Sequence, residues 1–144
     1  MIELKSDQLY VQFQTLGGTL SSIKDKEGVE YLWQGDPTYW SGQAPVLFPI
    51  CGSVRNDTIL YDKEDGSQKE GKIPRHGLVR KKDFTLVEQT DNSVTFAIED
   101  DEEMYANYPY HFRLEITYTV TGKTIRTQYK IYNKESEKSM PYFI

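Results

Sequence analysis

The chain has 144 residues, a formal net charge of −5 at pH 7 and a sequence pI of about 5.1. This length is typical of one domain with its own buried core. Lysine and arginine are interspersed with aspartate and glutamate rather than clustered, which argues against a nucleic-acid partner. The sequence shows no long apolar stretch and no secretory h-region, so neither a membrane partner nor secretion is expected.

Cys51 is the one cysteine of the sequence. A disulfide framework is therefore excluded, and a soluble protein in a reducing compartment, the cytoplasm, is expected. A nucleophilic role for Cys51 would need a neighbouring base, and the adjacent sequence offers none. We expect Cys51 to be a small residue packed in a tight turn.

Eleven tyrosines, six phenylalanines and two tryptophans favour β structure. Apolar and polar residues alternate with a period of two in several segments, which is the pattern of half-buried strands. In chain order, this pattern predicts strands at 9–14, 84–87, 94–99, 112–120 and 125–132. Residues 101–107 are the one segment that fits a short helix.

Turn residues separate these predicted strands. Gly122 lies between the two longest runs and supplies the positive φ that a tight hairpin needs. Further reversals are expected at 26–28, 65–66 and 91–93. These features predict an all-β fold, an antiparallel β-sandwich in which each sheet has one solvent face. No repeat or linker marks a domain boundary.

The sequence offers no metal-ligand signature. Residues 99–103 are five consecutive acidic residues, and carboxylates on a short turn point in different directions. A solvated loop or the start of a helix is the expected role of this run. The two histidines are far apart in sequence and have no nearby histidine or cysteine partner at ligand spacing.

His76 is the first candidate for chemistry, because imidazole suits proton transfer or hydrogen bonding to a sugar hydroxyl near neutral pH. Pro74 fixes the approaching backbone and Gly77 permits close access. Arg75 and Arg80 would disfavour a protonated ring. The same local sequence is compatible with a surface histidine in a basic turn.

Arg55 is the second candidate. It follows the Cys-Gly-Ser break that ends an apolar run containing two prolines. A guanidinium at a strand end can donate two hydrogen bonds to vicinal hydroxyls or to a carboxylate. An ordinary ion pair at a sheet edge is the alternative role.

Two further sets of residues have structural interpretations. His111 lies on the polar phase of the predicted strand 112–120, so a solvent-facing or structural role is expected. Trp33, Tyr39 and Trp40 could form a platform for a pyranose, but core packing or a lid on one end of the sandwich is the favoured interpretation.

Five segments, taken in their order along the chain, carry a family pattern. They are 16–23 (LGGTLSSI), 30–40 (EYLWQGDPTYW), 44–56 (APVLFPICGSVRN), 75–84 (RHGLVRKKDF) and 140–144 (MPYFI). Together they resemble the aldose 1-epimerases (galactose mutarotases), and most closely the branch named after the lactose-operon X protein. Each segment is weak alone, and the shared order makes the resemblance strong.

The resemblance implies a large antiparallel β-sandwich of the galactose-mutarotase type, a supersandwich, with residues 1–144 as the N-terminal portion of one domain. Family members interconvert the α and β anomers of aldohexoses such as galactose and glucose. A general base takes the proton of the anomeric hydroxyl while a general acid protonates the ring oxygen, so the ring opens, the C1–C2 bond rotates and the ring closes. The resemblance implies no metal or organic cofactor.

The resemblance also assigns roles to residues. His76 matches the first of the two active-site histidines of the family, and Arg55 matches the sugar-binding arginine, with Asn56 beside it as a further sugar-binding residue. In the family, this arginine and this histidine chiefly grip and orient the sugar. The principal acid is a second histidine in a Gly-His-Pro segment, and the base is a glutamate much further on; neither has a counterpart here, and His111 is not in such a segment.

We therefore expect the chain to carry the substrate-binding half of an epimerase site, to be a truncated or excised piece, and to have little or no mutarotase activity alone. An incomplete sandwich would expose open sheet edges, which favours self-association. Two other functions stay open: a non-catalytic carbohydrate-binding sandwich, and a remnant without a sugar function. Hexose 6-phosphates are alternative ligands because Arg75 and Arg80 flank His76.

Overall fold

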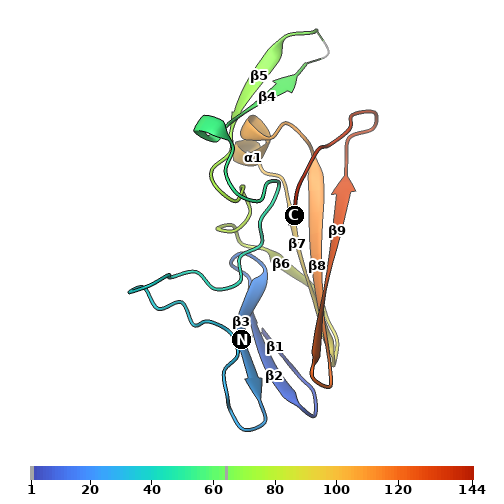
Figure 1. Ribbon diagram of the computed structural model, residues 1–144. Helices are drawn as coiled ribbons and strands as arrows, with labels where there is room; N and C mark the ends of the chain where they lie inside the picture. Colours follow the sequence, from blue (N-terminus) through green and yellow to red (C-terminus); the bar gives the residue numbers. More distant parts are fainter. Residues whose placement is uncertain (1, 64) are drawn as a thin grey trace.

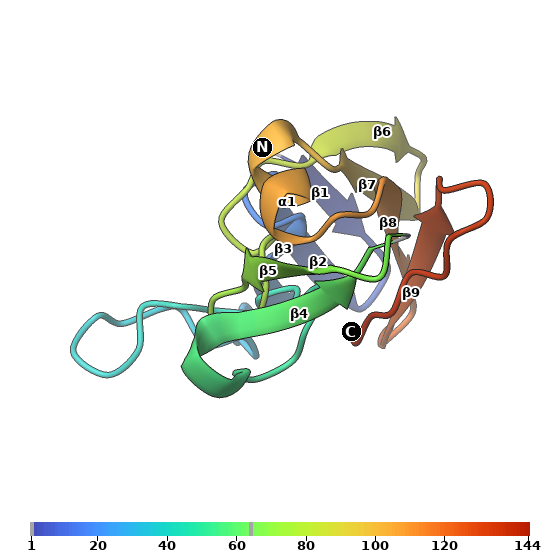
Figure 2. The ribbon, with the colours of Figure 1, turned by 90° about the horizontal axis from the view of Figure 1, so that it is seen from above.

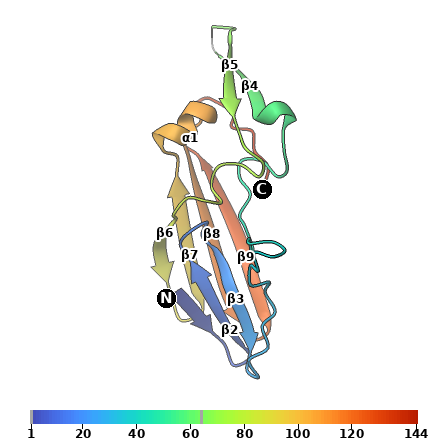
Figure 3. The same ribbon diagram turned by 90° about the vertical axis from the view of Figure 1, so that its left-hand side faces the viewer.

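Two antiparallel sheets face each other in the computed structural model, which describes residues 2–63 and 65–144 (Figure 1 and Figure 3). The three-stranded sheet has the order β1-β2-β3, and the four-stranded sheet has the order β6-β7-β8-β9. The first sheet consists of β1 (Ile2–Lys5), β2 (Leu9–Gln14) and β3 (Thr19–Asp25). The second consists of β6 (Thr85–Gln89), β7 (Ser93–Glu99), β8 (Phe112–Thr121) and β9 (Thr124–Asn133).

The remaining elements gather at one end of the sandwich. A short 3-10 helix, η1 (Arg55–Asp57), leads into the hairpin of β4 (Thr58–Asp62) and β5 (Gln68–Lys72). The helix α1 (Glu102–Asn107) connects β7 to β8 and lies beside β5 (Figure 1). No helix among the described residues has the length and apolar character needed to cross a membrane.

The predicted all-β fold is confirmed. Every predicted strand corresponds to an observed one, and the expected helix begins after Asp101, whose Oδ1 accepts a hydrogen bond from Met104 N at 2.7 Å. That contact explains part of the acidic run, because an N-terminal aspartate satisfies a free helix N–H. Four strands were not predicted: β1, β3, β4 and β5. Strand β5 reads QKEGK, so it has no apolar alternation for a pattern to detect.

Phe13 of β2 joins the two sheets. Its ring centroid lies 5.1 Å from that of Tyr118 on β8 and 6.1 Å from that of Phe96 on β7. The Tyr118 hydroxyl donates to the carbonyl of Gly18, at 3.0 Å, and so satisfies a buried backbone acceptor of the facing sheet. Buried side chains of β8 alternate with half-buried ones from Phe112 to Val120, as the period-two pattern predicts, and Thr121 at the end of the strand is exposed.

A second aromatic cluster lies above this core, at the end that carries α1 and the β4–β5 hairpin. Phe48 is its centre, with ring centroids 4.9 Å from Phe112, 6.1 Å from Tyr108 and 6.0 Å from Tyr142. Tyr61 of β4 adds its ring to the same cluster through Tyr108, at 6.3 Å. This cluster fixes the loop segment around Phe48 against the start of β8.

Tyr61 brings a testable consequence. Its hydroxyl is buried with no hydrogen-bond partner among the described residues, and burial raises its pKa to about 12. Tyr61→Phe removes an unsatisfied group, so the free energy of unfolding at pH 7 should stay unchanged or rise by about 1 kcal/mol. Tyr118→Phe is the matched control: it leaves the buried Gly18 carbonyl unpaired and should cost about 1–2 kcal/mol.

The Tyr61→Phe variant also has a pH signature. The unfolded chain ionises Tyr61 at its ordinary value, whereas the folded chain resists ionisation, so this residue's contribution to stability should fall as the pH rises from about 10 to about 12. Tyr61→Phe should flatten that part of the stability profile in urea unfolding. A variant profile parallel to that of the parent would contradict the assignment.

Candidate functional site

Two segments far apart in sequence are tied together at the site, and three backbone hydrogen bonds join them. Leu78 N donates to Phe48 O at 2.8 Å, His76 N donates to Gly52 O at 2.7 Å, and Ile73 N donates to Asp57 O at 2.9 Å. The segments 48–57 and 73–78 carry the candidate residues Arg55, Asn56 and His76. The structure therefore brings these candidates into one region, between the aromatic cluster and the β4–β5 hairpin.

Gly77 is the point of closest approach between these segments. It has a φ of +84°, and a Cβ added there would lie 2.1 Å from the carbonyl oxygen of Phe48. No side chain fits that space, so the sequence needs glycine after His76. The absence of a Cβ at Gly77 thus serves a close approach to the Phe48 backbone, and access of a ligand to His76 stays a prediction.

His76 is held in an unusual conformation. Its φ is +72°, in the left-handed region that non-glycine residues seldom occupy, and its side chain is half-buried. Besides the backbone bond to Gly52 O, the ring Nδ1 accepts a hydrogen bond from Gly52 N at 3.1 Å. Gly52 thus fixes both the backbone and the ring of His76. Sequence reasoning singled out the break at Gly52 but gave no sign that its backbone would orient the imidazole.

This contact also determines the ring tautomer. A neutral imidazole has one acceptor nitrogen, and the Gly52 N–H occupies Nδ1, so the proton of the neutral ring is on Nε2. Arg75 Nε also donates toward Nε2, at 3.2 Å, and a neutral ring cannot accept hydrogen bonds at both nitrogens. We assign the acceptor to Nδ1, because the Gly52 N–H belongs to a fixed backbone whereas the Arg75 side chain is exposed and free to reorient. His76 then presents an Nε2–H donor.

Arg55 and Asn56 lie in η1, three and four residues beyond Gly52. Asn56 and Asp57 both have positive φ, +56° and +50°, which turns the chain sharply after Arg55. The Arg55 side chain is exposed and has no hydrogen bond or ion pair with any residue in 2–63 or 65–144. Among the described residues the alternative of an ordinary ion pair is therefore not realised, and within them the guanidinium is open to a ligand.

A cationic hollow of about 250 Å³ borders the same loop, at Pro74, Gly77 and Leu78. Lys72, Arg80, Lys81 and Lys82 line it together with Glu103. Lys82 is already neutralised, since its Nζ lies 2.6 Å from Glu103 and 2.9 Å from Asp101, and these hydrogen bonds raise the pKa of Lys82. The hollow keeps an excess of positive charge at Lys72, Arg80 and Lys81.

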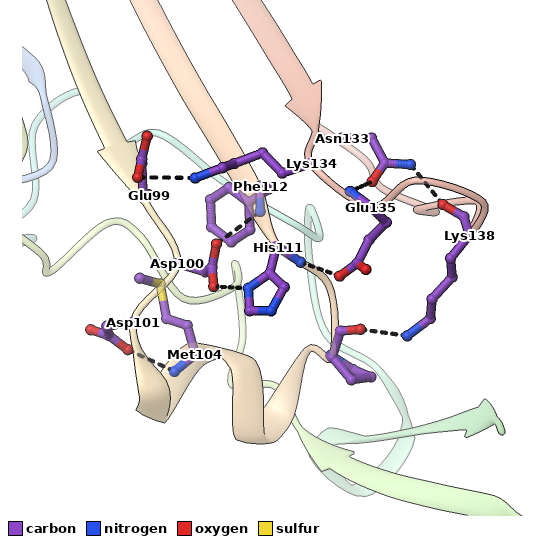
Figure 4. A network of polar contacts seen from close by, with 11 residues as sticks. Glu99, Asp100, Asp101, Met104, His111, Phe112, Asn133, Lys134, Glu135 and Lys138 are labelled. Carbon is purple, nitrogen blue, oxygen red and sulfur yellow. Dashed lines mark hydrogen bonds and ion pairs between the residues drawn. The ribbon is translucent and has the colours of Figure 1, made fainter.

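His111 belongs to a structural network at the end of the long sheet (Figure 4). Its Nδ1 lies 2.7 Å from Asp100 Oδ2, its ring stacks on Tyr105 of α1 at 4.3 Å, and its backbone N donates to Glu135 Oε1 at 2.7 Å. Asp100 also accepts from Phe112 N at 2.8 Å. The expected structural and solvent-facing role of His111 is confirmed, because these contacts join β7, α1, β8 and the chain after β9.

One expectation is wrong, and another is wrong in part. Cys51 is exposed rather than packed in its turn. Trp33, Tyr39 and Trp40 are 41%, 80% and 51% exposed, so core packing is excluded, while a lid on one end of the sandwich stays a prediction. They lie on the loop between β3 and η1, which projects from the body of the molecule (Figure 1 and Figure 2).

That loop is nevertheless ordered by internal contacts. Trp33 Nε1 donates to Trp40 O at 2.8 Å, and the rings of Trp33 and Tyr39 meet edge to face at 6.2 Å. Within the described residues, no three side chains of histidine, cysteine, aspartate or glutamate are grouped closely enough to hold a metal ion.

Comparison with known proteins identifies relatives over the whole chain. The family model described as aldose 1-epimerase matches residues 1–144. Two proteins of Lactococcus lactis subsp. lactis, named Protein LacX, chromosomal, and Protein LacX, plasmid, are each 59% identical over 143 residues. The match covers 99% of this chain and 48% of each relative, so the chain spans about half the length of these relatives.

Solved structures show the same fold. A galactose mutarotase-like protein from Lactobacillus casei matches with a TM-score of 0.88 and 30% identity, over 99% of this chain and 47% of that chain. A galactose mutarotase related enzyme from Lactobacillus acidophilus matches with a TM-score of 0.87 and 29% identity, over 94% and 44%. These matches confirm the predicted antiparallel β-sandwich of the galactose-mutarotase type.

The Gly77 contact is open to a direct test. Gly77→Ala should lower the free energy of unfolding by at least about 3 kcal/mol, because the new Cβ adds an overlap with Phe48 O to the cost of a positive φ. Gly28→Ala is the matched control, since Gly28 has nearly the same φ of +85° with nothing within 4 Å, and it should cost about 1–2 kcal/mol. Equal losses in chemical denaturation would show that the close approach does not constrain the site.

Proposed function

Because the chain belongs to the aldose 1-epimerase family, we propose that Arg55, Asn56 and His76 form the sugar-binding half of an aldose 1-epimerase site. The ligand is an aldohexose such as galactose or glucose. The observation that carries this proposal is the double hydrogen bond between Gly52 and His76, which orients the imidazole next to the segment of Arg55, whose guanidinium has no ion pair or hydrogen bond among the described residues.

The chemistry of these groups suits a pyranose. A planar guanidinium donates two parallel hydrogen bonds and can bridge vicinal hydroxyls. The Nε2–H of His76 donates to a third sugar oxygen, and the Asn56 amide can both donate and accept. In the tautomer that Gly52 imposes, His76 grips and orients the sugar and is no general base, which agrees with the role that the family resemblance implies.

We further propose that the 144-residue chain does not catalyse anomer exchange by itself. The sequence contains no Gly-His-Pro segment, which carries the principal acid in the family. Positioned proton donors and acceptors catalyse such a reaction. The sugar-binding half alone should therefore bind the sugar without raising the rate of anomer exchange. The proposed function needs no metal or organic cofactor. We also propose a cytoplasmic location.

The second candidate function is non-catalytic carbohydrate binding. The exposed and internally ordered side chains of Trp33, Tyr39 and Trp40 favour it, since an aromatic face can pack against the C–H face of a pyranose. Hexose 6-phosphates are alternative ligands because of the cationic hollow that borders the 74–78 loop. We also propose that open sheet edges support self-association of this chain, whether or not sugar binds.

Sugar binding is tested by NMR titration of galactose, glucose and galactose 6-phosphate. Arg55→Gln and His76→Asn should each weaken binding about 10- to 100-fold, the loss expected for one charged or oriented hydrogen-bonding group. Asparagine is chosen for position 76 because it tolerates a positive φ. His111→Ala is the control: it removes the other histidine, which lies in the structural network at Asp100, and it should bind sugar as the parent does. Unchanged affinity in both site variants would overturn the assignment.

Anomer exchange is tested separately. Polarimetry or exchange NMR on freshly dissolved α-galactose should show the spontaneous rate with and without the chain. A rate enhancement that disappears in His76→Asn would contradict the proposed lack of activity and would make this chain a complete catalyst. Saturable binding at the spontaneous rate is the expected result.

A further inference from the structure

The dipeptide Phe48–Pro49 is bonded to two separate segments of the chain. Leu78 N, in the loop that carries the candidate histidine, donates to Phe48 O at 2.8 Å. Phe143 N donates to the next carbonyl, Pro49 O, at 2.9 Å. Residues 141–143, which follow the turn after β9 and lie near the start of β8 (Figure 1), therefore form a strap along this dipeptide.

The strap is anchored by a buried tyrosine. The hydroxyl of Tyr108 donates to Pro141 O at 2.8 Å. Tyr108 is 2% exposed, and its ring meets the Phe48 ring edge to face, with the centroids 6.1 Å apart. Burial raises the pKa of Tyr108, so the hydroxyl keeps its proton and remains a donor. One side chain thus contacts both the strap and the segment that the strap holds.

Backbone contacts continue from this segment to His76. Phe48 forms a parallel bridge with Gly77, at the close approach where no Cβ fits. Gly52, four residues after Phe48, bonds both the backbone and the ring of His76. Close-packed contacts transmit a displacement rather than absorb it. A movement of Phe48 would therefore shift the groups that orient the imidazole.

We propose that Tyr108 is a positioning residue for His76, and that it acts through the strap and the Phe48–Pro49 dipeptide. The consequence for ligand binding rests on the proposed function, in which the Nε2–H of His76 donates to the sugar. Tyr108 is buried and does not touch the sugar itself. It fixes the direction of the His76 donor, and a hydrogen bond weakens steeply when its donor is misaligned.

Tyr108→Phe tests the anchor, because it removes the hydroxyl and keeps the ring that packs on Phe48. In NMR titration of the 144-residue chain with galactose and glucose, the dissociation constant of the tighter sugar should rise about threefold to tenfold, the worth of one hydrogen bond. Tyr61→Phe is the matched control. It removes a hydroxyl without a partner among the described residues from the same aromatic cluster, and it should bind sugar as the parent does.

The ¹⁵N NMR signals of the His76 ring separate positioning from stability, and His111→Ala assigns them, since the sequence has two histidines. At a pH where the ring is neutral, the parent and Tyr61→Phe should show an unprotonated Nδ1 and a protonated Nε2. Tyr108→Phe should shift both signals toward a mixture of tautomers, because Gly52 no longer holds the ring in one place. A merely structural role would lower the free energy of unfolding and leave these signals of the folded chain unchanged.

The other bond of the strap gives a second pair of variants, which serves even if Tyr108→Phe does not fold. Phe143→Pro removes the N–H that donates to Pro49 O. Phe143→Ala keeps that N–H and shortens a residue that is 71% exposed. The proline variant should weaken sugar binding about threefold to tenfold and shift the His76 signals, whereas the alanine variant should match the parent.

The outcomes distinguish this inference from the proposed function. If Tyr108→Phe and Phe143→Pro bind sugar as the parent does and leave the His76 signals unchanged, the positioning role is overturned and the sugar site stands. Equal losses in Tyr108→Phe and Tyr61→Phe would also overturn it, because the loss would then come from the cluster and not from the bond.

A parent chain that binds no sugar would overturn the proposed function instead. The His76 signals would still decide the positioning role, because they need no ligand: a change in Tyr108→Phe but not in Tyr61→Phe supports it, and no change in either overturns it. Circular dichroism of each variant confirms that a loss of binding is not a loss of fold.

Discussion

The arrangement of the candidate site depends on one contact, the close approach of Gly77 to the Phe48 carbonyl. Because no Cβ separates the two segments, Leu78 N reaches Phe48 O and His76 reaches Gly52 with both its backbone and its ring. A larger residue at 77 would push the loop outward and break these bonds together. The tautomer of His76, and hence the donor it presents, is a consequence of backbone packing rather than of neighbouring charges.

The sandwich supports this contact through aromatic packing. Phe48 is fully buried and meets Phe112 at the start of β8, while the hydroxyl of Tyr108 donates to Pro141 O at 2.8 Å and holds the last residues against the same cluster. Phe143 N then donates to Pro49 O at 2.9 Å. The site region is therefore assembled from four parts of the chain, and its position relative to the long sheet is set by large side chains with few ways to pack.

Strands β8 and β9 of the four-stranded sheet differ in how well their inner side chains are covered. Strand β8 buries one face completely because the three-stranded sheet and the aromatic cluster cover it, whereas β9 extends past that cover and keeps Tyr129 partly exposed. The sequences of the two strands alternate in the same way, so their pattern could not distinguish a central strand from an edge strand. Which strand is covered depends on the width of the facing sheet, a property of the tertiary structure.

The sequence by itself determined the all-β class, the strands with regular alternation, the short helix after Asp101 and the hairpin at Gly122, because these follow from local periodicity and turn chemistry. It also marked His76 and Arg55 as candidates. Only the tertiary structure decided that Gly52 orients the imidazole, that Arg55 has no ion partner among residues 2–63 and 65–144, that Cys51 and the side chains of Trp33, Tyr39 and Trp40 are exposed, and that β5 is a strand. Each of these depends on contacts between residues far apart in sequence, or on cover from another segment, and a one-dimensional pattern carries neither.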